Sequence, residues 1–347
     1  MTRRILTLCA ALVAASPAAA DPGDAVDTPR LKSTVKVRAE WAARYQDARY
    51  GPEVTERFSR AVNVGPTGAL EISNVAGDIV VTGGSGSQVR IEAVKRARAR
   101  AEGDAQALLG ELRIEVTELT NRVEVRTVYP RNRRNYSGSV EYTVSMPAGG
   151  RATIKTVSGD VRVTNVRGEL RAESVSGNVT ASGSARLALV KSVSGDVQVT
   201  DASTEGIATV STVSGDVTAR KLKARALELG TVSGDVLATD VTCERATLKT
   251  VSGSLEYSGT LSRNGRYEMT AHSGNVRLAL SGNTGFELEA TTFNGDVRSD
   301  FPITLHSSPD GDGRRGRRNR SIRGSYGDAS AIVNLQSFSG DIIVTKR

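Results

Sequence analysis

The sequence predicts an all-β protein, a parallel β-solenoid of about nine or ten coils with roughly 18–21 residues per coil. Three observations lead to this fold class. A motif of the form T/S-V-S-G-D/N-V occurs six times between Thr156 and Leu255, the last time as TVSGSL. The glycines of successive copies are 18, 18, 20, 19 and 19 residues apart. Only 4% of the residues are aromatic and 35 are glycine, which suits a core of small stacked side chains. A repeat this short cannot bury its own apolar face, so each copy must stack on the next.

The first twenty residues have the pattern of a secretory signal peptide. Arg3 and Arg4 precede an apolar run, and small residues precede Asp21, where the mature chain is expected to start. The apolar run is shorter than the roughly 20 residues that span a bilayer, and no later segment reaches that length. We therefore expect an exported, soluble protein, periplasmic or extracellular. Cys243 is the only cysteine beyond the signal peptide, so no disulfide framework is expected and a buried role in a coil is favoured.

The rest of the chain divides into three regions. Residues 21–57 form a polar segment in which a short helix around Trp41 would cap the solenoid, the alternative being a flexible tail. Residues 58–148 form an N-terminal β module with longer excursions, including one short helix between Glu102 and Arg113. Residues 149–347 form the regular solenoid, with a basic loop at 306–327.

Aligning the copies on their glycines assigns the two faces of each strand. Looser copies surround Gly77, Gly274, Gly295 and Gly340. The residues two and four positions after the glycine are mostly Val, Ala or Leu, and the residue between them is mostly polar; the residue five positions before the glycine is again apolar. Because alternate residues of a strand face opposite sides, the apolar columns lie inside. Each coil then has at least two short strands joined at the S-G-D corner, repeating every ~4.8 Å.

The corner has a conformational interpretation and a metal-binding one. Glycine tolerates positive φ, and Asp or Asn can accept hydrogen bonds from backbone amides at a bend. A calcium ladder is the alternative, because six aspartates would lie in one column: Asp160, Asp196, Asp216, Asp235, Asp296 and Asp341. Asn178, Ser254 and Asn275 interrupt that column, and the glycine-rich nine-residue calcium repeat is absent. The turn role is favoured, and no metal site is expected.

A second column, two positions before each glycine, contains large apolar residues. It holds valine from Val157 to Val251 and then His272, Phe293 and Phe338. Strict alternation would turn these side chains outward and form a stripe for a binding partner, with His272, Phe293 and Phe338 as its aromatic end. A bend could instead bury the column. Burial is favoured here, because a long exposed apolar stripe would be an aggregation hazard.

Three stretches carry a resemblance to a known family. They are FSRAVNVGPTGALEISNVAGDIVVTG at 58–83, VEYTVSMPAGGRATIKTVSGDVRV at 140–163, and the S-G-D-V/I copies up to Gly340. They resemble a bacterial family of adhesin-like repeat proteins whose β-solenoid domain is called Toastrack. The resemblance implies a parallel β-solenoid of the cell envelope, with no catalytic residues to carry over. Some members have an adjoining transmembrane or signalling domain, which is not expected for this chain.

The strongest interruption of the repeat is a basic segment. Of the formal charge of +8, much lies between Asp310 and Ser325, which contains six arginines: Arg314, Arg315, Arg317, Arg318, Arg320 and Arg323. One hypothesis is an exposed loop that binds an anionic envelope polymer; the other, which is favoured, is a solvated loop without a partner. No aromatic residues alternate with the arginines, so no specific nucleic-acid binding is expected.

No catalytic constellation or cofactor motif is apparent in the sequence. His272 and His306 are the only histidines, and the outward columns contain no repeated pair of acids. The sequence therefore predicts a noncatalytic cell-envelope solenoid with a structural or interaction role, binding an envelope protein or an anionic polymer or associating with itself. The alternative, based on compartment and fold alone, is a carbohydrate-active β-helix protein.

Overall fold

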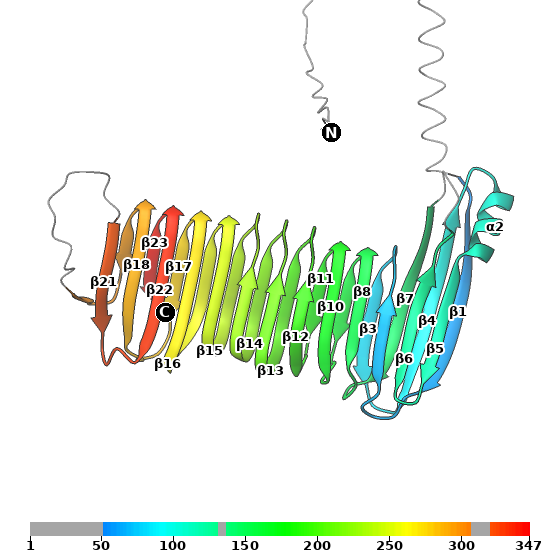
Figure 1. Cartoon of the computed structure of the whole chain (residues 1–347), viewed down its shortest axis with the longest axis horizontal. Helices are drawn as coiled ribbons and strands as arrows, with labels where there is room; N and C mark the ends of the chain where they lie inside the picture. Colours follow the sequence, from blue (N-terminus) through cyan, green and yellow to red (C-terminus); the bar gives the residue numbers. More distant parts are fainter. Residues whose placement is uncertain (1–50, 131–136, 307–319) are drawn as a thin grey trace, which may run out of the picture. The chain divides into compact units, whose positions relative to one another are not determined.

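The computed structural model describes residues 51–130, 137–306 and 320–347, and Ala48–Arg347 form one compact unit. The strands on the two sides of each corner stack into parallel ladders (Figure 1). On the first side lie β2 (Ala69–Ser73), β8 (Ala152–Ser158), β10 (Glu169–Ser176), β12 (Arg186–Lys191), β18 (Phe286–Asn294) and β22 (Ala331–Ser339). On the second side lie β3 (Ile79–Gly84), β9 (Val161–Thr164), β11 (Val179–Ser182), β17 (Val276–Leu280), β19 (Val297–Ser299) and β23 (Ile342–Lys346). Four longer strands contribute to both sides: β13 (Val197–Ser211), β14 (Val217–Gly230), β15 (Val236–Ser252) and β16 (Leu255–Ser273). The predicted parallel β-solenoid is confirmed.

The inward columns are buried as the sequence predicts. Val161, Val197 and Val236, two residues after their glycines, are at most 1% exposed, and so are Ile154 and Val210 on the first side. Cys243 is buried as expected, beside the buried rings of Tyr257 and Tyr267, which meet edge to face. Burial raises the pKa of the Cys243 thiol to about 11.

The corner glycines combine an unusual backbone conformation with close packing between coils. Gly215 has a φ of 138°, and a Cβ atom placed on it would lie 2.4 Å from the carbonyl oxygen of Gly195 in the neighbouring coil. That carbonyl accepts a hydrogen bond of 2.9 Å from the Thr212 hydroxyl. Only glycine therefore fits both the bend and the distance between coils.

The corner aspartates connect successive coils. Oδ1 of Asp196 accepts a hydrogen bond of 2.9 Å from the backbone N–H of Asp216, and Oδ1 of Asp216 accepts one of 2.8 Å from that of Asp235. Asn178 uses its Oδ1 in the same way toward Asp196, at 2.8 Å. The sequence correctly suggests that these side chains bind backbone amides, but the amides belong to the next coil.

A second bend, which the sequence analysis did not identify, follows six residues after the corner glycine. Its residues have left-handed backbone angles, with φ values of 50–66°. They are Asn165, Gly183, Asp201, Lys221 and Asp240. The strong presence of Asn, Asp and Gly in this column is the signal that could have revealed it, because these residues adopt the left-handed conformation most readily.

The order of the coils differs from the order of the chain at the C-terminal end. Strand β22 pairs in parallel with β16 on one side and with β18 on the other, so the final coil lies between two earlier ones. A Cβ on Gly340 would approach Gly274 O at 2.2 Å, and one on Gly295 would approach Gly340 O at the same distance. The expectation that each copy stacks on the next copy in sequence is therefore wrong here.

Antiparallel strands cover both ends of the parallel ladder. At the N-terminal end, β7 (Ser137–Pro147) pairs with β4 (Gln88–Arg98), β4 pairs with β1 (Glu53–Asn63), and β6 (Arg122–Val128) pairs with β5 (Arg113–Leu119). The helix α2 (Glu102–Glu111) contacts β1 and β4, which confirms the helix expected in this stretch. At the other end, β21 (Arg320–Tyr326) pairs antiparallel with β18 and with β20 (Thr304–Leu305). The short helix expected around Trp41 lies outside the described residues. The antiparallel strands thus cover both ladders at the N-terminal end, but at the other end they cover only the ladder that ends in β18, because among the described strands β19 pairs with β23 alone.

Candidate functional site

The column two residues before each corner glycine is exposed, not buried. We call it the apolar stripe. In spatial order its members among the described residues are Val75, Val157, Val175, Val193, Val213, Val232, Val251, His272, Phe338 and Phe293. The exposed fractions of its valines range from 39% to 48%, and those of Phe293 and Phe338 are 38% and 50%. The expectation that this column is buried is wrong.

The hydrogen bonds of the neighbouring column explain why the stripe faces outward. One residue before the stripe, the buried hydroxyls of Ser192 and Thr231 donate to the corner carbonyls of Gly177 and Gly215, at 2.8 and 3.0 Å. With these side chains held inward, the alternation of side chains turns the next residue outward, and the bend lies at that residue and the ones after it. The hazard of an exposed edge does not arise, because the backbone of each stripe residue lies within the stack.

The stripe ends in a stack of three parallel rings. The rings of His272 and Phe338 lie 4.9 Å apart at 11°, and those of Phe338 and Phe293 lie 4.9 Å apart at 4°. The insertion of β22 between β16 and β18 places Phe338 in the middle of this stack. The sequence identifies all three residues, but only the structure orders them.

Charged residues flank the stripe on both sides. Two residues before it on the same strand face are Lys155, Glu173, Lys191 and Lys249. At the corner, three residues after it, is the row that contains Asp160, Asn178, Asp196 and Ser254. In the part of the chain that the structure describes, Lys155 and Lys191 make no ion pair, whereas Nζ of Lys249 lies 3.5 Å from Oε1 of Glu268. The stripe is thus an apolar band between a partly basic column and an acidic row.

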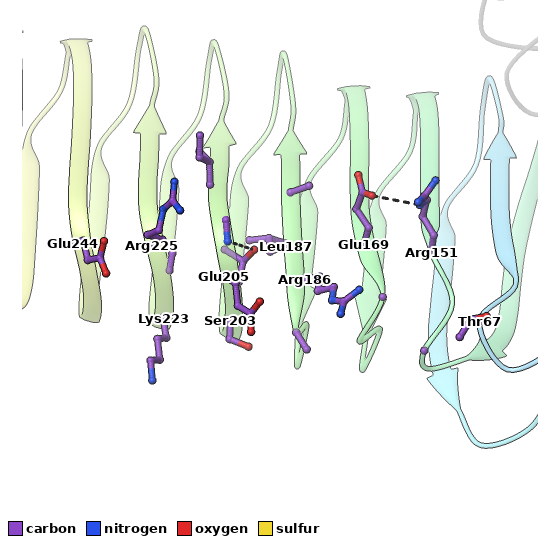
Figure 2. A pocket seen from close by; sticks show the side chains of 18 residues that line it. Thr67, Arg151, Glu169, Arg186, Leu187, Ser203, Glu205, Lys223, Arg225 and Glu244 are labelled. Carbon is purple, nitrogen blue, oxygen red and sulfur yellow. Dashed lines mark hydrogen bonds and ion pairs between the residues drawn. The ribbon is translucent and has the colours of Figure 1, made fainter.

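A groove with a volume of about 990 Å³ lies along the segments that lead into the first-side strands, and none of its lining residues belongs to the stripe (Figure 2). Six of its charged lining residues alternate in sign from coil to coil, namely Arg151, Glu169, Arg186, Glu205, Arg225 and Glu244, and Lys223 adds a further positive charge beside Arg225. Nε of Arg151 lies 3.4 Å from Oε2 of Glu169, as the dashed line in Figure 2 shows. The acidic and basic side chains of the lining largely offset one another, with one positive charge in excess.

The spacing of the glycines is the signal that could have located this groove. The coils from Gly159 to Gly195 have 18 residues each, and the next has 20. The additional residues form a bulge between Thr204 and Ile207, which lines the groove beside the shorter coils. Unequal coil lengths therefore contribute to this groove.

Most of the Arg-rich loop lies outside the described residues. Arg314, Arg315, Arg317 and Arg318 fall in the undescribed segment, and of Arg320 only the backbone pairing in β21 is described. Arg323 is exposed, and its guanidinium lies 3.6 Å from Oε1 of Glu287 on β18. The pairing of Leu305 with Gly324 holds the two ends of the segment together at the end of the ladder.

The two histidines have different surroundings in the structure. His272 belongs to the ring stack, and His306 lies with its Nε2 3.2 Å from Oγ of Ser325 on an exposed hairpin. Nucleophilic catalysis also needs a group that orients the imidazole. A metal site is a separate question. Within the described ranges, no group of three or more His, Cys, Asp or Glu side chains, the Asp corner row included, is placed so that it could hold a metal ion. Among those same residues there is no helix long and apolar enough to cross a membrane.

The fold and the stripe define the class of the protein: a capped, parallel β-solenoid repeat protein with an ordered apolar band along one corner. Residues 184–345 match the family model described as Toastrack DUF4097, in agreement with the sequence resemblance. No curated protein matches the chain.

Several solved structures are similar to the chain. A "putative adhesin" from Bacteroides fragilis is 13% identical with a TM-score of 0.39, covering 84% of this chain and 97% of its own. A "putative adhesin" from Parabacteroides merdae is 10% identical with a TM-score of 0.32, covering 84% and 96%. A "putative cell adhesion protein" from Clostridium sporogenes is 13% identical with a TM-score of 0.24, covering 84% and 100%. At these identities and TM-scores the likeness transfers no activity or partner to this chain.

Proposed function

We propose that this protein is an exported, noncatalytic component of the cell envelope that acts by binding, and that the apolar stripe is its binding surface. The observation that carries the proposal is the stripe itself, exposed at every level of the ladder. Ten levels at ~4.8 Å make a band ~43 Å long. Soluble monomers rarely expose a continuous apolar patch of this kind without a partner.

The rigidity of the stripe favours binding. Its side chains are mostly valines, whose χ1 freedom is already restricted, and the backbone beneath them bonds from coil to coil, for example from Val213 N–H to Val193 O and from Val232 N–H to Val213 O. Little conformational entropy would be lost when a partner covers such a surface. The first twenty residues, with their signal-peptide pattern, support export.

A pair of matched variants tests the stripe. Val213→Arg places a charge in the middle of the stripe, and Ile207→Arg places the same charge on a 52% exposed residue in the groove. We expect Val213→Arg to abolish retention of the purified chain by a cell-envelope fraction, while Ile207→Arg retains it. Equal retention of both variants would contradict the proposal. Turnover of an acidic polysaccharide by the wild-type chain would instead favour the carbohydrate-active alternative.

The Arg-rich loop is the second candidate binding element. Its ends are held together by the β20–β21 pairing, so its charges would be presented at one end of the ladder. We propose that it binds an anionic envelope polymer through charge, which predicts strong salt dependence.

The test of the loop replaces Arg314, Arg315, Arg317 and Arg318 with Ser. Salt-sensitive retention on an anionic envelope polymer should be lost. The control variant loses the same amount of charge elsewhere on the surface and should retain most of the binding. It replaces four exposed arginines with Ser: Arg90, Arg113, Arg126 and Arg167. If the two quadruple variants behave alike, the charge of the whole molecule and not the loop is responsible.

A further inference from the structure

We propose that the partner of the apolar stripe is a second copy of this chain, related by a two-fold axis parallel to the solenoid axis, so that each coil faces the same coil of its partner. This inference rests on the proposed function of the stripe and names its occupant. It follows from the order of charges beside the stripe.

A two-fold axis along the stripe would bring the corner row of one copy opposite the basic column of the other. At the level of Val157 this places Lys155 opposite Asp160 of the partner subunit, and the reciprocal pair forms as well. At the level of Val193, Lys191 and Asp196 stand in the same relation. All four side chains are exposed, and within the described part of one copy none of them forms an ion pair. The Oδ1 atoms of Asp160 and Asp196 accept backbone hydrogen bonds, which leaves their Oδ2 atoms for a lysine of the partner subunit.

At the level between these two, both flanking residues differ from the Lys and Asp of the neighbouring levels. At Val175 the column residue is acidic, Glu173, and the corner residue that would face it is Asn178 instead of Asp. A carboxylate at 178 would place like charges opposite each other, which disfavours association. The neutral residue therefore occurs at the level where a charge would be repulsive.

The opposite arrangement is electrostatically unfavourable. If the two-fold axis crossed the stripe at a right angle, the acidic corner rows of both copies would face each other. In the register in which the third level from each end faces the other, Asp160 would meet Asp341 and Asp216 would meet Asp235, and no lysine would lie opposite an aspartate. Charge complementarity thus selects the parallel arrangement.

The size of the contact predicts a weak dimer. The stripe with one flanking column on each side is a band ~43 Å long and ~14 Å wide, since two residues along a strand span ~6.8 Å. This corresponds to about 600 Å² per copy, or about 1,200 Å² in total, at the lower limit for a specific interface. We expect a concentration-dependent equilibrium between monomer and dimer.

Analytical ultracentrifugation of the purified chain tests self-association. Val213→Arg, which enters the interface twice, should weaken the dimer about 100-fold or more, in line with the loss of a central interface residue. Ile207→Arg should leave the dissociation constant within about 3-fold of wild type. Circular dichroism of both variants checks that they fold.

Adding a negative charge at the corner, and then reversing the charge that faces it, tests the parallel arrangement while keeping the hydrogen bonds of the corner. Asn178→Asp keeps the side-chain oxygen that accepts the N–H of Asp196, and adjacent aspartates already occur at 196, 216 and 235. It should weaken the dimer about 3- to 10-fold through the facing Glu173. Adding Glu173→Lys should restore or strengthen association, because that level then matches the levels of Lys155 and Lys191.

Cross-linking tests the axis directly. Facing sheets lie ~10 Å apart, beyond the reach of a disulfide, so a short bismaleimide is the reagent. In the parallel arrangement Val175→Cys faces its own copy and cross-links. In the crossed arrangement Val175, third from one end of the stripe, would face His272, and the two introduced thiols would lie ~24 Å apart. Ile207→Cys and the wild-type chain are the controls.

The outcomes separate this inference from the proposed function. A chain that stays monomeric, while Val213→Arg still loses envelope retention, overturns the dimer and leaves the stripe as a surface for another molecule, such as a lipid or a different protein. A monomeric chain whose retention is unaffected by Val213→Arg overturns both. A dimer in which Val175→Cys does not cross-link overturns the parallel arrangement. A dimer that responds to all three changes as described supports it.

Discussion

Replacing a corner glycine is expected to damage the solenoid more than almost any other small change. We choose Gly215→Ala because the structure gives two independent reasons for its cost. The φ of Gly215 is 138°, a conformation that residues with a Cβ rarely adopt. The added Cβ would also lie 2.4 Å from Gly195 O and 2.9 Å from Oδ1 of Asp196.

The magnitude follows from these contacts. Backbone strain of this kind costs about 1–3 kcal/mol. Separating the two coils to relieve the clash adds about 1–3 kcal/mol for overpacking. It also stretches the bond from the Thr212 hydroxyl to Gly195 O and the bond from Asp216 N–H to Asp196, each worth about 1 kcal/mol. Because these contributions are not independent, we expect a destabilisation of about 3–5 kcal/mol.

Urea unfolding followed by circular dichroism measures this loss, and amide hydrogen exchange at Asp216 and Val217 locates it. Gly206→Ala is the matched control in the same region. A Cβ on Gly206 meets only Oγ1 of Thr204, at 3.8 Å, and its φ is not positive, so its effect should stay within about 0.5 kcal/mol. If the two alanine variants unfold at the same urea concentration, the argument from the corner geometry fails.

Three further predictions concern the corner row, the buried thiol and the helix. Asp196→Asn should be nearly neutral, because Asn178 makes the same bond, whereas Asp196→Ala should cost about 0.5–1.5 kcal/mol in urea unfolding by removing the acceptor of the Asp216 N–H. The pKa of Cys243 is raised by burial from 9.0 to about 11, so the thiol should resist maleimide in the folded chain. The folded chain keeps this proton to higher pH than the unfolded chain. The stabilising contribution is therefore complete below pH 9 and is lost as the pH rises toward about 11, as urea midpoints against pH should show. Gly110→Ala, on helix α2 with no atom within 4 Å of its added Cβ, should raise the free energy of unfolding by about 0.5–1 kcal/mol.

Each of these has a clear contrary result. Equal destabilisation by Asp196→Asn and Asp196→Ala would mean that the bond between coils contributes nothing. Rapid labelling of the folded chain at neutral pH, or an alkaline loss of stability unchanged in Cys243→Ser, would contradict the role assigned to the buried thiol. A loss of stability in Gly110→Ala would show that α2 needs glycine there for a reason other than space.

The sequence alone predicts the repeating parts of this fold well, because those parts depend on local rules. The alternation of Val161 and Val163 with Arg162 follows from strand geometry, and the corner at Gly159 follows from the conformational freedom of glycine. It also correctly predicts a short helix between Glu102 and Arg113, which the structure has at Glu102–Glu111, and the burial of Cys243. For the candidate site, the sequence alone identifies the residues at the aromatic end of the stripe and the arginines of the basic segment.

Only the tertiary structure decides how these parts combine. Whether Val213 is buried depends on where the chain bends relative to its alternation, and the hydroxyls of Thr212 and Thr231 determine that phase through bonds to another coil. Phe338 neighbours His272 because β22 pairs with β16. That pairing joins residues that are far apart in sequence, and the local repeat does not specify it. Short repeats encode the coil because its geometry is local, but the coil order, the groove and the exposed stripe arise from contacts between coils, which no single repeat contains.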